Sequence, residues 1–292
     1  MAPTIRAVLV DLSGTIHVGD MAVPGAVEAV GRLRHPSSPS SSAAPSSDNQ
    51  REQAAPPLQV RFLTNTSTKS SSDLLEQLRR IGFASSSSSP SIIEKSDLVT
   101  SVLATRDYLL RNGMRPYCIT EDATASDLDG VDLDPPHDSV VVGLAPTRLD
   151  YRHMNRAFRI LLDNPGNLVA VHRANYVRDV DDGQLSLGPG GFVAALEAAS
   201  GCRPATVVGK PSKAFFESAM WPDIPASETC MVGDDVVQDV KGAIDAGIGT
   251  TILVKTGKYR DGDETKLGDG VAPTVTCDSI VEAVDYILRN RG

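Results

Sequence analysis

Short runs of apolar residues alternate with segments of helical periodicity along much of this 292-residue chain. Runs at 5–11, 60–67, 205–210, 229–235 and 250–257 are continuous and rich in β-branched residues, as buried strands are. Apolar strands that are separated by helices are typical of a parallel sheet covered on both faces. The pattern therefore predicts an α/β fold whose core is a doubly wound parallel sheet.

The ends of several helices can be predicted from their capping residues. Gly82 is expected to end a helix that begins at Ser71, because glycine readily adopts the left-handed conformation found there. Asp150 is the expected N-cap of a helix over 151–163, and Asp278 is the expected N-cap of the last helix.

The middle of the chain forms a separate α/β set, which predicts a second domain inserted into the first. We expect core segments at 1–83 and 188–292 and an inserted domain at 84–187. The expected elements of the insert are helices at 96–113 and 151–163 and strands at 116–120, 139–144 and 167–174.

Two patches depart from globular composition. Residues 36–57 are rich in Ser, Pro and Ala, and residues 85–91 are almost entirely Ser. Neither patch contains enough apolar surface to offset the entropy lost on ordering. We expect both to be mobile surface insertions.

The charge balance limits the classes of partner. The chain has 28 Lys and Arg against 37 Asp and Glu, a net charge of −9. Nucleic acid and anionic membranes both require a basic face, so neither is the expected main partner. The chain has no apolar run of about 18 residues, which a membrane-spanning helix needs. No secretion signal is recognised at the N-terminus and no CxxC pair is present, so we expect a cytoplasmic protein with reduced thiols.

Polar residues follow several of the predicted strands. In an open parallel sheet, ligands bind outside the carboxyl ends of the strands. Carboxylates, a hydroxyl and an ammonium group gathered there could hold Mg²⁺ and neutralise a phosphoryl group, and a carboxylate can also act as a nucleophile. The residues concerned are Asp11, Ser13, Gly14, Thr15, Thr64, Asn65, Lys210, Asp234 and Asp235.

The ordered motifs DLSGT, TNT, GKP and GDDVVQD resemble those of the haloacid dehalogenase (HAD) superfamily of hydrolases. Within it, the chain resembles the branch that carries a large α/β (C2-type) cap between the second and third motifs. This resemblance implies a Rossmann-like core, a cap domain at 84–187 and a Mg²⁺-dependent phosphatase that acts on a phosphorylated small molecule. It also implies a homodimer formed through the cap.

The resemblance assigns roles to individual residues at the metal. Asp11 matches the nucleophile that attacks phosphorus and forms an aspartyl-phosphate. Asp11, Asp234 and the backbone carbonyl of Ser13 match the Mg²⁺ ligands. Asp239 and Asp235 match the outer shell of the metal.

A second set of residues matches the phosphate-binding positions of the family. Thr64 matches the hydroxyl that holds a phosphate oxygen, with the backbone of Asn65 beside it. Lys210 matches the lysine that screens the nucleophile from the negative charge of the phosphate. Ser13 and Gly14 complete the expected phosphate-binding residues.

Ser13 departs from the pattern of most phosphatases in the superfamily, which read DxDGT where this chain reads DLSGT. The second Asp of that motif is the general acid/base, and a serine hydroxyl cannot replace it near pH 7. Losing such a group lowers rates by about 10²–10⁴-fold. We therefore expect substrates whose leaving groups depart easily, such as pyrophosphate, acyl phosphates, phosphoramidates or aryl phosphates, and slow turnover of the aspartyl-phosphate.

Two other functions are compatible with these residues. The chain could be a phosphate-binding or scaffold protein with little turnover, because Ser13 removes the acid/base. It could also be a true dehalogenase, although Thr64, Lys210 and Asp234 favour phosphate over an alkyl halide. If the insert contacts substrate, the expected contact residues are His172, Arg173, Asn175, Tyr176 and Arg178.

Overall fold

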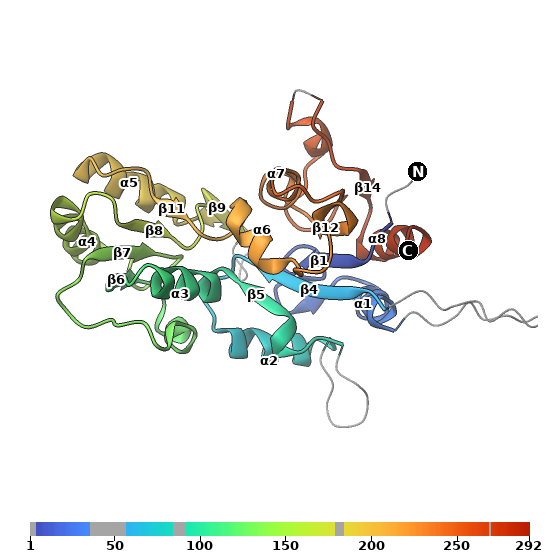
Figure 1. The fold of residues 1–292 in the computed structure, drawn as a ribbon, viewed down its shortest axis with the longest axis horizontal. Coiled ribbons are helices and arrows are strands. Elements are labelled where there is room, and N and C mark those ends of the chain that lie inside the picture. Colours follow the sequence, from blue (N-terminus) through green and yellow to red (C-terminus); the bar gives the residue numbers. More distant parts are fainter. Residues whose placement is uncertain (1–3, 36–56, 84–91, 179–183, 269) are drawn as a thin grey trace, which may run out of the picture. The chain divides into compact units, whose positions relative to one another are not determined.

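The computed structural model describes residues 4–35, 57–83, 92–178, 184–268 and 270–292 (Figure 1). The Ser-rich patches predicted at 36–57 and 85–91 lie outside the described residues, apart from Pro57. The chain divides into two compact units. The first comprises Met1–Arg61, Ser87–Ile92 and Met220–Gly292, and the second comprises Phe62–Ser86 and Ile93–Ala219. The domain boundaries expected at 84 and 187 stay a prediction.

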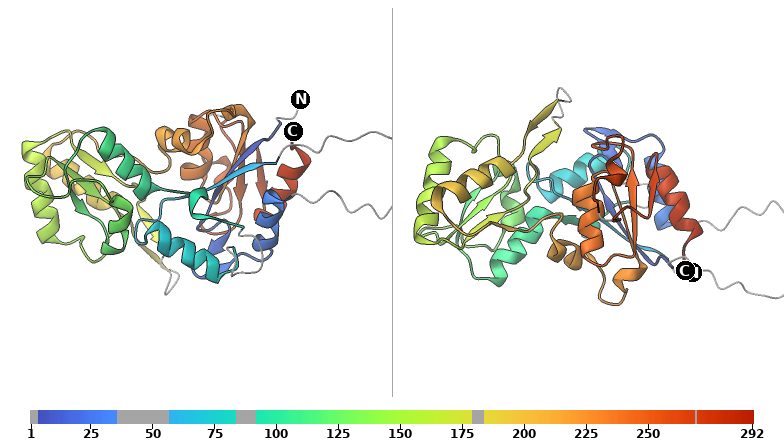
Figure 2. Two further views of the ribbon diagram at one scale, coloured as in Figure 1. Left: turned by 60° about the horizontal axis from the view of Figure 1, so that its bottom comes forward. Right: turned by 90° about the horizontal axis from the view of Figure 1, so that it is seen from above.

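The first unit is built on a parallel sheet with the strand order β14-β13-β12-β1-β4. Every residue of β1, β12 and β13 is buried. Figure 2 shows α1 and α8 side by side on one face of this sheet and the helical segment 236–245 on the other. The doubly wound, Rossmann-like core predicted from the sequence is thereby confirmed.

The strands are β1 (Ala7–Asp11), β4 (Gln59–Thr64), β12 (Thr229–Gly233), β13 (Thr250–Val254) and β14 (Val275–Cys277). The hairpin strands are β2 (His17–Val18) and β3 (Met21–Ala22), and the helices are α1 (Ala26–Arg34), α7 (Gly242–Asp245) and α8 (Ile280–Arg289).

Strand β4 continues into the second unit, where it pairs in parallel with β5 (Leu98–Thr100). The helix predicted at 96–113 is therefore wrong at its start, because α3 spans only Ser101–Arg111. The hydroxyl of Thr100 accepts a 3.1 Å hydrogen bond from the N–H of Leu103 and so caps the helix after the strand.

The second unit contains a four-stranded parallel sheet with the order β11-β8-β7-β6. The run at 205–210 was expected to lie with the strands of the first sheet. This expectation is wrong, because β11 pairs with β8. The strands are β6 (Pro116–Ile119), β7 (Ser139–Val142), β8 (Leu168–Ala170) and β11 (Thr206–Val207), with a hairpin of β9 (Tyr176–Arg178) and β10 (Leu185–Leu187). The remaining helices are α2 (Ser71–Arg80), α4 (Tyr151–Asp163), α5 (Gly190–Ser200) and α6 (Lys213–Ala219).

Side chains that alternate along β7 reach two separate cores of the second unit. Val140 and Val142 pack in one cluster with residues of α4 and α5, such as Leu161. Val141 packs in the other cluster with residues of α3, such as Leu109. Because successive side chains of a strand point to opposite faces, this sheet is covered by helices on both sides.

The predicted helix ends are largely confirmed. Gly82 follows α2 with a φ of +99°. The carboxylate of Asp150 caps α4 by accepting a 2.8 Å hydrogen bond from the N–H of His153. The last helix differs by one residue, because Ser279 rather than Asp278 is its N-cap. No helix in the described part of the chain has the length and apolar character needed to cross a bilayer.

Candidate active site

Three carboxylates of the first unit converge at the carboxyl ends of two neighbouring strands. Asp11 ends β1, Asp234 directly follows β12, and Asp239 lies in the helical turn that comes next. All three side chains are buried. Each offers one oxygen, and these three oxygens lie within 4.8 Å of one another. Parallel pairing of β1 with β12 brings the three groups together, as the sequence predicted for Asp11 and Asp234.

The loop after β12 positions Asp239. Asp235 caps the π-helical turn Val236–Lys241, because its carboxylate accepts the N–H groups of Val237 and Gln238. One turn later the carboxylate of Asp239 accepts a 3.1 Å hydrogen bond from the N–H of Asp235. A Cβ on Gly233 would overlap the side chain of Asp239, so glycine is required for this approach.

Glycines also surround Asp234. A Cβ on either Gly14 or Gly257 would overlap Oδ2 of Asp234, and both glycines have positive φ angles, of +96° and +56°. Next to Gly14, the hydroxyl of Thr15 donates a 3.1 Å hydrogen bond to Oδ2 of Asp11. The DLSGT loop therefore contacts the carboxylate of Asp234 through Gly14 and orients that of Asp11 through Thr15.

Lys258 is a residue of this cluster that the sequence analysis missed. Its backbone N–H donates a 2.6 Å hydrogen bond to Oδ2 of Asp234, and its Nζ lies 3.7 Å from Oδ2 of Asp235. The signal was present, because Lys258 follows β13, which ends at the same edge of the sheet as β12.

The electrostatics of the cluster indicate a cation site. Burial raises the pKa of Asp234 well above its usual range, and the nearby charges of Asp11 and Asp239 raise it further. Burial acts to lower the pKa of Lys258, but the carboxylates around it, led by Asp235, outweigh burial and raise it. Several carboxylate oxygens facing one another are the donor set that hard divalent cations prefer. The residues present therefore fit Mg²⁺.

Ser13 is exposed and lies in the tight turn between Asp11 and Gly14. The N–H of Gly14 donates a 2.7 Å hydrogen bond to the carbonyl of His17, which closes this turn. The exposed side chain at position 13 is a hydroxyl, and no carboxyl group is available at this point of the loop.

The remaining predicted residues lie in the second unit, where two of them are held together. Asn65 donates a 2.9 Å hydrogen bond from Nδ2 to the carbonyl of Lys210, and its Oδ1 accepts one of 2.9 Å from the N–H of Lys210. Lys210 and Thr64 are both buried. The hydroxyl of Thr64 is 2.9 Å from that of Thr66 and accepts the N–H of Thr66. The TNT and GKP motifs therefore meet, although β11, which precedes Lys210, belongs to a different sheet from β4.

Two of the expected substrate-contact residues have partners within the second unit. The guanidinium of Arg173 donates two hydrogen bonds to the carboxylate of Glu197, of 2.6 and 2.5 Å. Arg173 is therefore engaged by a carboxylate of its own unit, and its contact with a substrate stays a prediction. His172 is buried, with its Nε2 3.3 Å from the hydroxyl of Ser67. Both residues therefore have hydrogen-bond partners within this unit.

Comparison with known proteins relates the chain to one family. Residues 8–134 match the haloacid dehalogenase-like hydrolase family, and residues 207–283 match the related HAD-hydrolase-like family. Haloacid dehalogenase-like hydrolase domain-containing protein 2 of Bos taurus is 42% identical over 287 residues, 98% of this chain and 97% of that protein. Phospholysine phosphohistidine inorganic pyrophosphate phosphatase of Rattus norvegicus is 35% identical, over 98% of this chain and 95% of its own length.

A solved structure has the same fold. The glycerol phosphate phosphatase of Mycobacterium tuberculosis, in complex with magnesium, superposes with a TM-score of 0.75 at 24% identity, covering 96% of this chain and 76% of that one. This structure shows the fold, and the identity to the two relatives over nearly the full length of the chain shows the family. The chain belongs to the haloacid dehalogenase-like hydrolase family.

Proposed function

We propose that this protein is a Mg²⁺-dependent phosphatase that transfers a phosphoryl group to the carboxylate of Asp11. The observation that carries the proposal is the cluster of Asp11, Asp234 and Asp239, whose ligand oxygens lie within 4.8 Å of one another. The named activity of the Rattus norvegicus relative, a phosphatase, supports the same reaction class.

The metal would be held by Asp11, Asp234 and the backbone carbonyl of Ser13, with Asp235 and Asp239 in its outer shell. When bound, Mg²⁺ would offset the charge of the carboxylates and polarise the oxygens of the phosphoryl group. A magnesium ion in the mycobacterial phosphatase of the same fold supports this choice of metal.

Asp11 is oriented for attack by its neighbour. The hydroxyl of Thr15 donates a hydrogen bond to Oδ2 of Asp11 and so helps to orient this carboxylate. A bond forms from a carboxylate oxygen of Asp11 to phosphorus, and the bond from phosphorus to the leaving group breaks. Water then hydrolyses the aspartyl-phosphate, which releases inorganic phosphate and restores Asp11. Thr64, Asn65 and Lys210 are the residues that we propose to hold the phosphate oxygens in this reaction.

Ser13 sets the preference among substrates. A hydroxyl cannot protonate a leaving group near pH 7, so bonds to poor leaving groups should break slowly. Phosphoanhydrides, phosphoramidates and aryl phosphates carry leaving groups that depart with less assistance. The Rattus norvegicus relative is named for two phosphoramidates and a phosphoanhydride, which supports the same substrate class here.

Phosphate release from p-nitrophenyl phosphate tests the proposal, with and without Mg²⁺, in the wild type and in Asp11→Asn. Asp223→Asn removes an exposed carboxylate of the same unit and serves as the matched control. The proposal predicts Mg²⁺-dependent release that is lost in Asp11→Asn and kept in Asp223→Asn. Release no faster than in Asp11→Asn would contradict it and favour a phosphate-binding protein without turnover.

A homodimer formed through the inserted domain and a cytoplasmic location stay predictions. Light scattering coupled to size-exclusion chromatography tests the first. A mass close to the 30.9 kDa of one chain would contradict it.

A further inference from the structure

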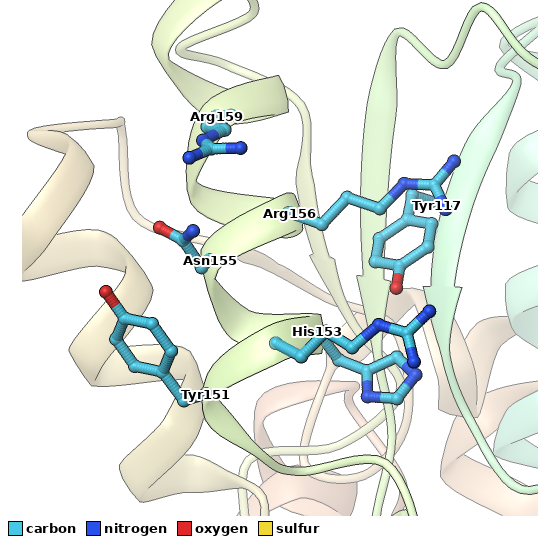
Figure 3. A pocket seen from close by; sticks show the side chains of 7 residues that line it. Tyr117, Tyr151, His153, Asn155, Arg156 and Arg159 are labelled. Carbon is cyan, nitrogen blue, oxygen red and sulfur yellow. The ribbon is translucent and has the colours of Figure 1, made fainter.

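A shallow groove lies on the surface of the second unit, over the exposed face of α4 and beside β6. Its volume is about 470 Å³, within the usual range for small-ligand sites. Side chains from α4 and Tyr117 of β6 line it (Figure 3). None of the lining residues belongs to the carboxylate cluster around Asp11 or to the pair Asn65 and Lys210.

Two rows of side chains run along this face of α4. Arg152, Arg156 and Arg159 form a row of cations, because residues three and four positions apart lie on one side of a helix. Tyr151 and Asn155 form the neighbouring row. Tyr151 is 84% exposed. The face therefore presents positive charge beside an uncovered aromatic ring and an amide.

Among the described residues, the three arginines of this row have no carboxylate partner, whereas several other surface arginines do. Within the described ranges, no carboxylate forms an ion pair with any of the three. Arg6, Arg79, Arg115 and Arg148, by contrast, each form one. This unpaired row occurs in a chain with a net charge of −9. Concentrated positive charge that is left unneutralised favours an anionic ligand.

Arg156 is already held in place. Its guanidinium lies 4.5 Å from the centre of the Tyr117 ring, and its Nη2 is 3.3 Å from Nε2 of His137. Figure 3 shows Arg156, Tyr117 and His153 gathered on the side of α4 that faces β6. His153 is held by the carboxylate of Asp150, 2.9 Å away. An ordered guanidinium loses less conformational entropy when it binds an anion.

We propose that this groove binds a nucleoside polyphosphate. Arg152, Arg156 and Arg159 would hold the phosphate chain, since planar guanidinium groups bind phosphate oxygens in pairs. The rise of 1.5 Å per residue places the first two arginines roughly 6 Å apart along the helix, so that they reach different phosphates of one chain. Tyr151 would stack on the base, and the amide of Asn155 would bind its polar edge.

Calorimetric titration with ATP in the presence of EDTA tests this site, because removal of divalent cations prevents turnover at Asp11. The site predicts saturable binding that is equal in the wild type and in Asp11→Asn. Arg156→Gln/Arg159→Gln should weaken ATP binding by about tenfold or more, which corresponds to the loss of charge-assisted contacts. Arg80→Gln, which removes an exposed arginine of α2, should change nothing.

Four further titrations separate the parts of the ligand. Inorganic tripolyphosphate should bind more weakly than ATP, and adenosine alone should not bind. Tyr151→Ala should reduce the affinity for ATP to that for tripolyphosphate and leave tripolyphosphate binding unchanged. Circular dichroism checks that each variant is folded.

Several results would overturn the proposal: no saturable binding of ATP, wild-type affinity in the double arginine variant, or equal losses in Arg80→Gln. Sedimentation in the absence of ligand supplies one further test. If the double arginine variant changes the mass of the particle and not its affinity for ATP, the arginine row binds a second copy of the chain and the proposal is wrong.

Discussion

A Cβ atom on Gly14 would overlap the Oδ2 oxygen of Asp234. The two residues therefore share a contact that glycine alone permits, and Gly14 adopts a left-handed φ of +96° there. The same oxygen accepts the N–H of Lys258 from the loop after β13. Asp234 is thus held from two sides by backbone, with no room for its carboxylate to move toward the DLSGT loop.

Replacing Gly14 by Ala should therefore disable the site. The left-handed conformation costs an alanine about 1–2 kcal/mol, and the new methyl group would displace Asp234. A displacement of a catalytic group by about 1 Å can lower rates by roughly 10²-fold. We expect Gly14→Ala to lose Mg²⁺-dependent release of p-nitrophenol to at least that extent, as measured by steady-state kinetics.

Gly262→Ala is the control for this substitution. Gly262 has a similar φ of +87°, but a Cβ there would meet nothing within 4 Å. The Gly262→Ala variant should lose stability through backbone strain and keep its activity. Equal activity losses in both variants would show that strain alone, and not contact with Asp234, explains the effect of Gly14→Ala.

Relative to the wild type, Asp234→Asn should be more stable without metal and less stable with it. Burial and the charges of Asp11 and Asp239 disfavour the ionised form of Asp234 and raise its pKa. Removing this charge should raise the unfolding temperature in EDTA. Mg²⁺ at 100 times its dissociation constant should stabilise the wild type by about 2.7 kcal/mol and leave the variant unchanged. Differential scanning calorimetry measures both effects, and equal stabilisation by Mg²⁺ would contradict the metal assignment.

Ser13→Asp should restore a general acid/base. Hydrolysis of alkyl phosphates, whose leaving groups need protonation, should rise by about 10²-fold, whereas that of p-nitrophenyl phosphate should change far less. Ser13→Asn is the control, because the asparagine side chain has nearly the same shape as that of aspartate and cannot ionise. If Ser13→Asn gave the same increase, the effect would come from shape and not from proton transfer.

The pair of Arg173 and Glu197 should make the second unit sensitive to acid. Hydrogen bonds from Arg173, and to a lesser degree from the N–H of Ala205, outweigh burial and lower the pKa of Glu197 below 4.5. A carboxyl group whose pKa is lower in the folded state than in the unfolded state stabilises the fold at pH values above its unfolded pKa. This stabilisation is lost as the pH falls through the folded pKa. In urea denaturation the wild type should be more stable than Glu197→Gln at neutral pH. This difference should shrink below pH 4.5. Glu28→Gln, at an exposed position, should show no such trend.

Local signals predicted some elements to the residue. Helix α4 begins and ends where the sequence placed it, because Asp150 caps it through contacts within one turn. Strand β5 was missed, because three residues are too few to show a strand period. Strand β11 was expected in the other sheet, because an apolar run does not specify which strand it will pair with.

The candidate site was predicted in part for similar reasons. Asp11 and Asp234 follow apolar strands, so their meeting at one edge of the sheet could be expected. Lys258 follows a predicted strand, which was a signal for its place at this edge. Its contact with Asp234, and that of Gly257, depend on the path of the loop after β13. The pairing of Arg173 with Glu197 depends on where α5 lies, which periodicity in the sequence does not reveal.

Detection of phosphorylated Asp11 tests the central claim most directly. The wild type would be mixed with p-nitrophenyl phosphate and Mg²⁺, quenched in acid, digested and examined by mass spectrometry. Because Ser13 cannot activate water, we expect the aspartyl-phosphate to accumulate, with the mass of one phosphoryl group added to the peptide at Asp11. Rapid release of phosphate with no phosphoryl group on Asp11, or with the group on another residue, would contradict the account.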